Sequence, residues 1–216
     1  MATKAKEVKQ IKGIDVSHWQ GNIDFNKVKA AGYEFVIIKA GGSDYGRYTD
    51  KKFKENYRKA TEAGLHVGAY YFNGPKCQGA ASGVADAKHF LQILGDLKFD
   101  YPVFCDIEAQ PAVKRIQNTE AAKAFCETME KACWWVGIYA SDVSGFRSRL
   151  EHSQLTQYTH WVADYTDPVT VCKEHQMRQY TSKGKVPGIS GSVDLDYSLI
   201  DYSATIKKKG LNNYKK

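Results

Sequence analysis

The strongest constraint on the fold is a regular alternation along the chain between short apolar runs and longer amphipathic segments. From Gly13 onward, runs rich in β-branched and aromatic residues are separated by segments of helical periodicity. Such alternation favours parallel strands joined by helical crossovers. We predict strands at 13–17, 34–40, 66–72, 102–108, 135–140, 160–165, 176–181 and 192–196.

Capping residues place helices between the early strands, whereas the third quarter holds only short, irregular helical segments. In the last quarter the strands follow one another almost directly. The predicted helices are 25–31 capped by Asp24, a helix capped by Thr49 or Asp50 that ends before Gly64, 83–94, and 120–132 opened by Thr119.

Eight strands with intervening helices predict an α/β fold of the TIM-barrel type. The chain has 216 residues, fewer than the ~250 typical of that barrel. A barrel that loses its helices in the second half reconciles the number of strands with the length. We expect a single barrel domain over residues 12–205, without an internal repeat or a linker.

The positive charge lies at the two ends of the chain. Of the net charge of +7, residues 1–12 carry +3 and residues 207–216 carry +5, which leaves residues 13–206 at −1. We expect a basic, disordered arm over 1–11 and a basic tail over 206–216 that is frayed or is the stub of a linker. A near-neutral body argues against nucleic-acid binding, which uses a basic folded face. The basic ends suit either an anionic polymer such as a bacterial wall or plain solubility.

The cysteines and the N-terminal segment indicate in which cellular compartment the protein is made. Five cysteines without a C-x-x-C favour buried thiols made in a reducing compartment over a disulfide framework or a zinc site, and we expect no metal and no cofactor. The N-terminal segment lacks the apolar region of a signal peptide, and no apolar run approaches the ~20 residues of a membrane span. We therefore expect synthesis in the cytoplasm and no insertion into a membrane.

The segment YPVFCDIEAQ, residues 101–110, ends an apolar strand with two acids. Residues two apart on a strand share a face, so Phe104, Asp106 and Glu108 are expected to point the same way. Adjacent buried carboxyls raise the pKa of one of them, and one protonated plus one ionised carboxyl is what glycoside cleavage requires. A salt-bridged pair, or an acidic pair on an exposed edge, explains D-x-E equally well when the motif stands alone.

Other strands also end in polar or aromatic residues. The carboxyl ends of parallel barrel strands form the rim where active sites lie. A closed barrel would therefore bring Asp15 from the first strand and Asp194 from the last beside Asp106 and Glu108. Acids can supply chemistry and bind sugar hydroxyls, while aromatic rings stack on sugar faces. This convergence favours a carbohydrate-active site over core packing.

Several segments together resemble glycoside hydrolase family 25, the Chalaropsis-type lysozymes common among phage endolysins and bacterial autolysins. The resemblance covers about residues 12–202, in order and with comparable spacing. It implies a flattened TIM-like barrel with five β/α units followed by three strands, and N-acetylmuramidase activity on peptidoglycan glycan strands. The segments that carry it are KGIDVSHWQGNIDF, FVIIKAGGSDY, HVGAYYF, PVFCDIE, VGIYAS, HWVADY and RQYTSKGKVPGISGSVDLD.

The family motifs map onto four acids of this chain. The resemblance implies that Glu108 is the general acid/base and that Asp106 assists it, either by stabilising an oxocarbenium-like centre or by orienting the substrate's N-acetyl group. Asp15 and Asp194 match the opening and closing aspartates. The closing motif is VDLD where the family often ends in asparagine, so Asp196 is an alternative to Asp194.

Candidate contacts to the sugar come from the same strand ends. We expect substrate contacts from Lys39, Tyr71, Tyr139, Trp161 and Gln179. Two other functions remain open at this point, a metal-dependent hydrolase that uses the acids as ligands and a wall-binding module without turnover. Family analogy implies a phage endolysin that reaches the wall after release, as a monomer or a homodimer.

Overall fold

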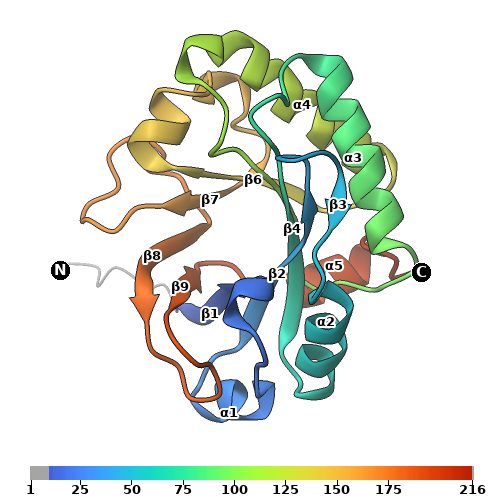
Figure 1. Cartoon of the computed structure of the whole chain (residues 1–216), viewed down its shortest axis with the longest axis vertical. Helices are drawn as coiled ribbons and strands as arrows, with labels where there is room; N and C mark the ends of the chain where they lie inside the picture. Colours follow the sequence, from blue (N-terminus) through green and yellow to red (C-terminus); the bar gives the residue numbers. More distant parts are fainter. Residues whose placement is uncertain (1–9, 216) are drawn as a thin grey trace, which may run out of the picture.

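Eight strands close into a barrel, because the first strand pairs with the second in parallel and with the last in antiparallel orientation (Figure 1). The structure is a computed structural model that describes residues 10–215. The order around the sheet is β1-β9-β8-β7-β6-β5-β4-β2-β3, and β3 lies outside the ring. The strands are β1 Ile11–Val16, β2 Phe35–Gly42, β3 Tyr48–Thr49, β4 His66–Phe72, β5 Val103–Asp106, β6 Val136–Ser141, β7 Thr159–Ala163, β8 Met177–Gly184 and β9 Val193–Ser198.

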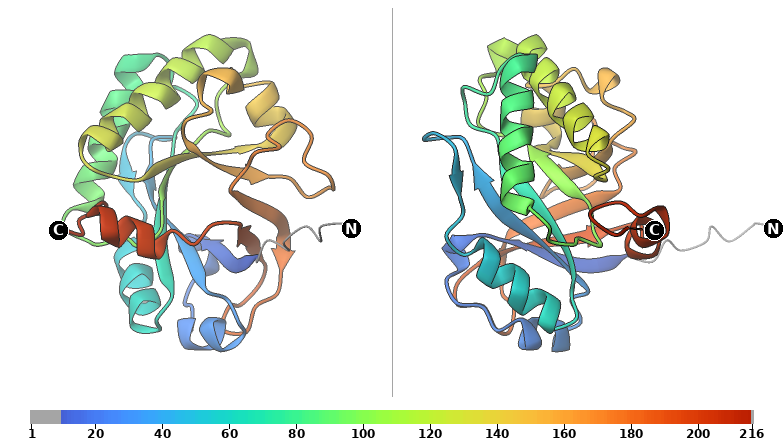
Figure 2. Two further views of the ribbon diagram at one scale, coloured as in Figure 1. Left: turned by 180° about the vertical axis from the view of Figure 1, so that it is seen from behind. Right: turned by 90° about the vertical axis from the view of Figure 1, so that its right-hand side faces the viewer.

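Helices cover the outside of the first part of the ring (Figure 2). After β6 the cover is a π-helical turn, Asp142–Arg147, and between β7 and α5 the described chain forms only strands and loops. The arrangement of five β/α units followed by three strands confirms the expected fold class. The helices are α1 Phe25–Ala30, α2 Phe53–Glu62, α3 Ala80–Leu94, α4 Arg115–Lys131 and α5 Ser203–Lys209.

The alternation of side chains on the strands gives the barrel two apolar layers. One layer lies between the strands and the helices and includes Ile38, Cys105 and Ile138. The other lies inside the ring and includes Phe104 and Trp161. The inner layer fills the barrel beneath the carboxyl ends of the parallel strands. The polar residues at these ends therefore lie on top of a packed apolar layer.

Three helix starts differ from the prediction. Helix α2 begins at Phe53 with Lys52 at its N-cap position, so neither Thr49 nor Asp50 caps it. Helix α4 begins at Arg115, so Thr119 lies inside it, where its hydroxyl donates to the Arg115 carbonyl and accepts from the Glu151 amide. Helix α3 begins at Ala80, and Gly83 allows it to approach α4 closely: a Cβ on Gly83 would lie 2.0 Å from the Ala121 carbonyl oxygen. The Asp24 cap on α1 is confirmed, since Asp24 accepts from the Lys27 amide at 3.2 Å.

The prediction of a frayed C-terminal tail from residue 206 is wrong. Helix α5 buries Ile206 completely, and the turn after it buries Asn212. The Asn212 side chain accepts from the Trp135 amide at 2.6 Å and donates to the Tyr101 carbonyl at 3.0 Å. Because Tyr101 and Trp135 precede β5 and β6, this segment closes the end of the barrel where the parallel strands begin.

The predicted basic arm over 1–11 lies outside the described residues except for Gln10 and Ile11, and Ile11 already opens β1. No helix within residues 10–215 is long and apolar enough to cross a membrane.

Candidate active site

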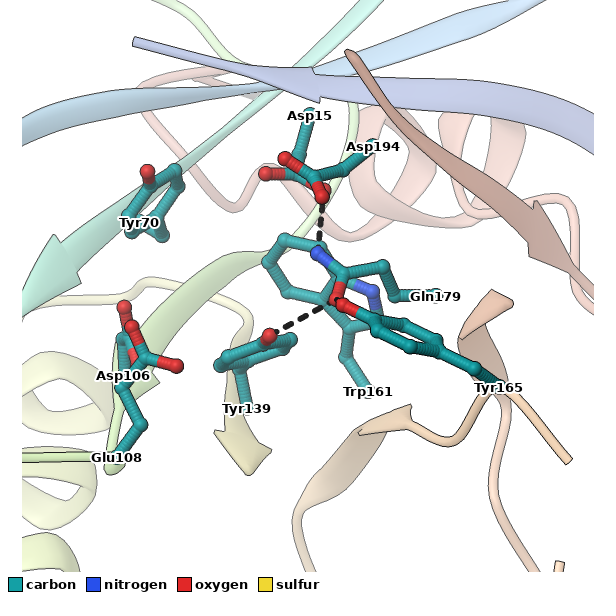
Figure 3. Close-up of a pocket in the computed structure, with 9 residues that line it drawn as sticks. All are labelled: Asp15, Tyr70, Asp106, Glu108, Tyr139, Trp161, Tyr165, Gln179 and Asp194. Carbon is teal, nitrogen blue, oxygen red and sulfur yellow. Dashed lines mark hydrogen bonds between the residues drawn. The ribbon is translucent and has the colours of Figure 1, made fainter. Parts of the chain in front are cut away.

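A pocket of about 200 Å³ opens at the carboxyl ends of the parallel strands (Figure 3). Acids and aromatic rings from six strands and the loops that follow them form its wall. Four of these residues are carboxylic acids, three are tyrosines, one is a tryptophan and one is a glutamine: Asp15, Asp106, Glu108, Asp194, Tyr70, Tyr139, Tyr165, Trp161 and Gln179. Seven of the nine predicted site residues are among them.

The D-x-E segment has the orientation that strand alternation predicts. Phe104 belongs to the inner apolar layer, and Asp106 and Glu108 line the pocket above it. Cys105 and Ile107 point outward into the layer beneath the helices. Asp106 is 2% exposed at the end of β5, whereas Glu108 lies beyond the strand at the open mouth of the pocket, where its side chain is exposed.

The antiparallel strand β9 brings the far end of the sequence to the same rim. Because β9 runs opposite to its neighbours, its beginning lies where the other strands end, and Asp194 pairs directly with Asp15. Asp194 lines the pocket. Asp196 lies two pairs deeper, opposite Gly13, is fully buried, and accepts a hydrogen bond from the Trp161 indole at 2.8 Å. The geometry therefore favours Asp194 as the rim acid.

Gln179 connects the acids to the aromatic wall. Its amide nitrogen donates to Asp15 Oδ2 at 2.8 Å, and its oxygen accepts from the hydroxyls of Tyr139 at 3.0 Å and Tyr165 at 2.8 Å. Figure 3 shows these residues on one side of the pocket and the Asp106–Glu108 couple on the other. Gln179 and Tyr139 are buried in the wall, whereas Tyr165 is 54% exposed.

Burial governs the protonation of the D-x-E couple. It raises the pKa of Asp106 well above its usual value, the charge of Glu108 adds to the rise, and Lys39 opposes it. Burial also raises the pKa of Glu108, with Lys39 opposing and Asp194 contributing. The rise is larger for Asp106 because Glu108 stands at the mouth in contact with solvent. The repulsion between Asp106 and Glu108 acts on both carboxyls, and the charge of Asp194 adds to the rise in the pKa of Glu108.

The opposite wall also retains protons. Burial, followed by the charges of Asp196 and Asp194, raises the pKa of Asp15 well above its usual value. Burial raises the pKa of Asp194 as well, and that of Asp196 to about 8. At neutral pH these acids therefore do not all carry a charge, which makes a cluster of five carboxyls compatible with a folded barrel.

Lys39 is close to the couple but does not line the pocket. It is 8% exposed, and its ammonium lies over the Phe72 ring at 4.4 Å. Its charge lowers the pKa of both Asp106 and Glu108. The structure thus places Lys39 as an electrostatic neighbour of the acids rather than as a wall contact.

Tyr71 is the predicted contact that the structure places elsewhere. Its ring is fully buried among the helices, and its hydroxyl donates to the Gly42 carbonyl at 3.0 Å. The neighbouring Tyr70 lines the pocket instead, and Tyr165 joins it. Residues 70–72 are all aromatic, so the sequence does not show which of them face the pocket. Whichever way the side chains alternate along the strand, at least one aromatic ring points into the barrel.

The acids of the pocket do not form a metal-ligand group. Within residues 10–215, the side chains whose ligand atoms approach closely enough to hold a metal ion are His152, His160 and Cys172, and they lie outside the pocket. The pocket has the composition of a general acid/base site: carboxyls whose pKa values burial raises, facing aromatic rings that can stack on a sugar.

Comparison with known proteins agrees with this chemistry. The chain is 30% identical to the autolytic lysozyme of Clostridium acetobutylicum over 190 residues, covering 86% of this chain and 55% of that protein. It is similar to the CTP1L endolysin, with a TM-score of 0.79, 29% identity and coverage of 91% of this chain and 69% of that one. It is also similar to a bacterial lysozyme from Streptomyces coelicolor, with a TM-score of 0.77, 28% identity and coverage of 97% and 100%.

The chain spans little more than half of the curated autolytic lysozyme, so similarity to that protein concerns one part of it. The family model for glycosyl hydrolases family 25 matches residues 14–189, which include Asp15 on β1 and the D-x-E couple after β5. This match extends over most of the barrel, and the chain belongs to glycosyl hydrolases family 25.

Proposed function

We propose that this chain is a lysozyme that hydrolyses the β-1,4 bond between N-acetylmuramic acid and N-acetylglucosamine in peptidoglycan. The observation that carries the proposal is the pair of carboxyls with raised pKa values, Asp106 and Glu108, across a pocket from Asp15 and Asp194 and between aromatic walls. The relatives described as a lysozyme, an autolytic lysozyme and an endolysin support the same substrate.

In this proposal Glu108 protonates the leaving glycosidic oxygen. Glu108 stands at the mouth of the pocket, so a bound glycan removes its carboxyl from water and raises its pKa further. General acid catalysis of this kind contributes about 10²–10⁴-fold to the rate. Once the glycan is bound, Glu108 is the acid of the couple that carries the proton, and its carboxyl faces the leaving oxygen.

Asp106 is proposed to orient the N-acetyl group of the substrate. Its Oδ1 atom is buried and accepts no hydrogen bond from the described residues. An acetamido N–H donated to this atom favours the ionised form of Asp106 and aims the acetamido carbonyl at the anomeric carbon. The product forms with net retention, and Glu108 then acts as the base for the attacking water.

Glu108→Gln tests the assignment. The variant should lower the rate of wall lysis by about 10²–10⁴-fold with an almost unchanged thermal melt. The matched control is Glu120→Gln, which makes the same change on the exposed face of α4 and should lyse walls at the normal rate. A Glu108→Gln protein that clears peptidoglycan at a similar rate contradicts the role of Glu108.

Mass spectrometry of the digestion products tests the bond. A reducing-end muramic acid supports the proposed muramidase, a reducing-end glucosamine shows that the other glycosidic bond is cut, and free peptide shows an amidase or peptidase. Binding to walls without new reducing ends would instead show a module without turnover. NMR of the first anomer released tests retention.

We also propose that the protein acts at the bacterial wall after release from the cell that makes it, as endolysins do. The relatives named as an autolytic lysozyme and an endolysin support this site of action. We expect a monomer or a homodimer, which light scattering of the full chain measures.

A further inference from the structure

Three metal-ligating side chains meet on the outer side of β7. His160 precedes Trp161 on this strand, and since Trp161 belongs to the inner layer, His160 points outward. His152 comes from the short 3-10 helix His152–Gln154, and Cys172 from the loop between β7 and β8. One ligand atom from each lies within 4.8 Å of the others.

The spacing of the cluster fits a tetrahedral metal ion. Cys172 Sγ lies 3.5 Å from His152 Nε2. In a tetrahedral zinc site, bonds of about 2.3 Å to sulfur and about 2.0–2.1 Å to nitrogen put these two atoms about 3.5 Å apart. A set of one thiol and two imidazoles also suits zinc far better than magnesium or calcium, which take oxygen ligands.

The tautomer of His160 is fixed by a backbone partner. Its Nε2 lies 3.1 Å from the Leu155 carbonyl oxygen in a buried position. A carbonyl oxygen only accepts hydrogen bonds, so this contact assigns the proton to Nε2 and leaves the lone pair on Nδ1. Histidines that bind metals almost always have such a partner on the second nitrogen.

The surroundings hold the ligands in place. Phe146 packs against both imidazoles, with ring centroids 5.3 Å from His152 and 5.1 Å from His160. The Asp142 carboxylate accepts from the Cys172 amide at 2.8 Å and so fixes the loop that carries the thiol.

We propose that His152, His160 and Cys172 bind a zinc ion, with water as the fourth ligand. On binding, the Cys172 thiol releases its proton to solvent as the zinc–sulfur bond forms. The bound ion ties the loop before β8 to β7 and to the 3-10 helix that carries His152, in the part of the barrel where short helical segments replace the long covering helices. It is a structural site, separate from the pocket that the acids form.

The first experiment measures zinc in the full-length protein. After incubation with zinc sulfate and dialysis, elemental analysis should find about one zinc per chain. Cys172→Ser and His152→Gln should each lower zinc affinity by at least about tenfold. Cys133→Ser is the control, because Cys133 is the exposed thiol and the obvious place for adventitious binding. It should retain full zinc binding.

A second measurement keeps the proposal testable if Cys172→Ser fails to fold. Cobalt added to the unaltered protein should give a thiolate-to-cobalt charge-transfer band that Cys133→Ser preserves and the half-buried His152→Gln weakens. Titration calorimetry in two buffers should show release of about one proton per zinc. The site is overturned if the unaltered protein does not retain zinc, or if Cys172→Ser and His152→Gln bind zinc as tightly as the unaltered protein; the contact between Cys172 and His152 is then an ordinary thiol–imidazole hydrogen bond.

Discussion

Replacing Asn212 with alanine should destabilise the whole barrel, although the residue lies in a segment whose sequence suggests a solvent-exposed tail. The change removes two buried hydrogen bonds and leaves the Trp135 amide and the Tyr101 carbonyl without them. Each buried backbone group without a partner costs about 1–3 kcal/mol, so the pair costs about 2–6 kcal/mol. Asn212 also has a φ of 53°, a left-handed conformation that costs alanine about 1 kcal/mol.

The expected loss of unfolding free energy is therefore about 3–7 kcal/mol, or roughly 10–20 °C in melting temperature for a chain of this length. Differential scanning calorimetry and urea denaturation measure it. Asn213→Ala is the matched control, because Asn213 shares the positive φ but donates to Gly95 and Leu97 nearer the surface. It should lose about 1–2 kcal/mol. Asn212→Gly should recover about 1 kcal/mol relative to alanine.

Equal melting temperatures for Asn212→Ala and Asn213→Ala would refute this reasoning. They would mean that the segment after α5 contributes nothing through its buried bonds. A large loss for Asn212→Ala would show that the cooperative unit of the barrel extends to the turn after α5.

Three further predictions concern the pocket. Tyr70→Phe should lower kcat/KM for wall hydrolysis, whereas Tyr71→Phe should leave it unchanged and reduce stability by about 1 kcal/mol through the lost bond to Gly42. Burial raises the pKa of Asp196 to about 8 in the folded protein, so between about pH 4 and 8 the folded state holds a proton that the unfolded state has lost, and stability falls as pH rises through this range. Asp196→Asn should therefore have a higher melting temperature than the unaltered protein at pH 9 but not at pH 4. Lys39→Met removes a charge that lowers the pKa of Glu108, so the alkaline limb of the pH–rate profile should move to higher pH; an unmoved limb would exclude Lys39 as an electrostatic neighbour of the acid.

The alternation of the strands was sufficient to predict the acids of the pocket. Asp106 and Glu108 follow an apolar strand with a clear period of two, so their shared face could be predicted without coordinates. Asp15 and Asp194 followed once a closed barrel was assumed, and their direct pairing confirms that they meet. Choosing between Asp194 and Asp196 required knowing how deep each residue lies in the barrel. Strand periodicity does not give this depth, because both residues lie on the same face of β9.

Other features depended on packing that no local pattern contains. Tyr70 and Tyr71 are chemically identical, and only the register of β4 against β5 decides which ring faces the pocket. Threonine is a residue type that favours helix N-caps, yet Thr119 lies inside α4, where its hydroxyl accepts a hydrogen bond from the Glu151 amide. The sequence spacing of His152, His160 and Cys172 matches no zinc-binding motif. Strand β7 and the loop after it bring the three side chains together.

The pairing of β9 with β1 has a consequence for biosynthesis. Residues 15 and 194 are separated by most of the chain, and the ring cannot close until β9 has left the ribosome. A nascent polypeptide that already exposes the D-x-E couple still lacks one wall, and contacts of such long sequence separation form slowly. The complete pocket wall therefore forms only late in synthesis, and a translation product interrupted before β9 lacks the strand that closes the ring.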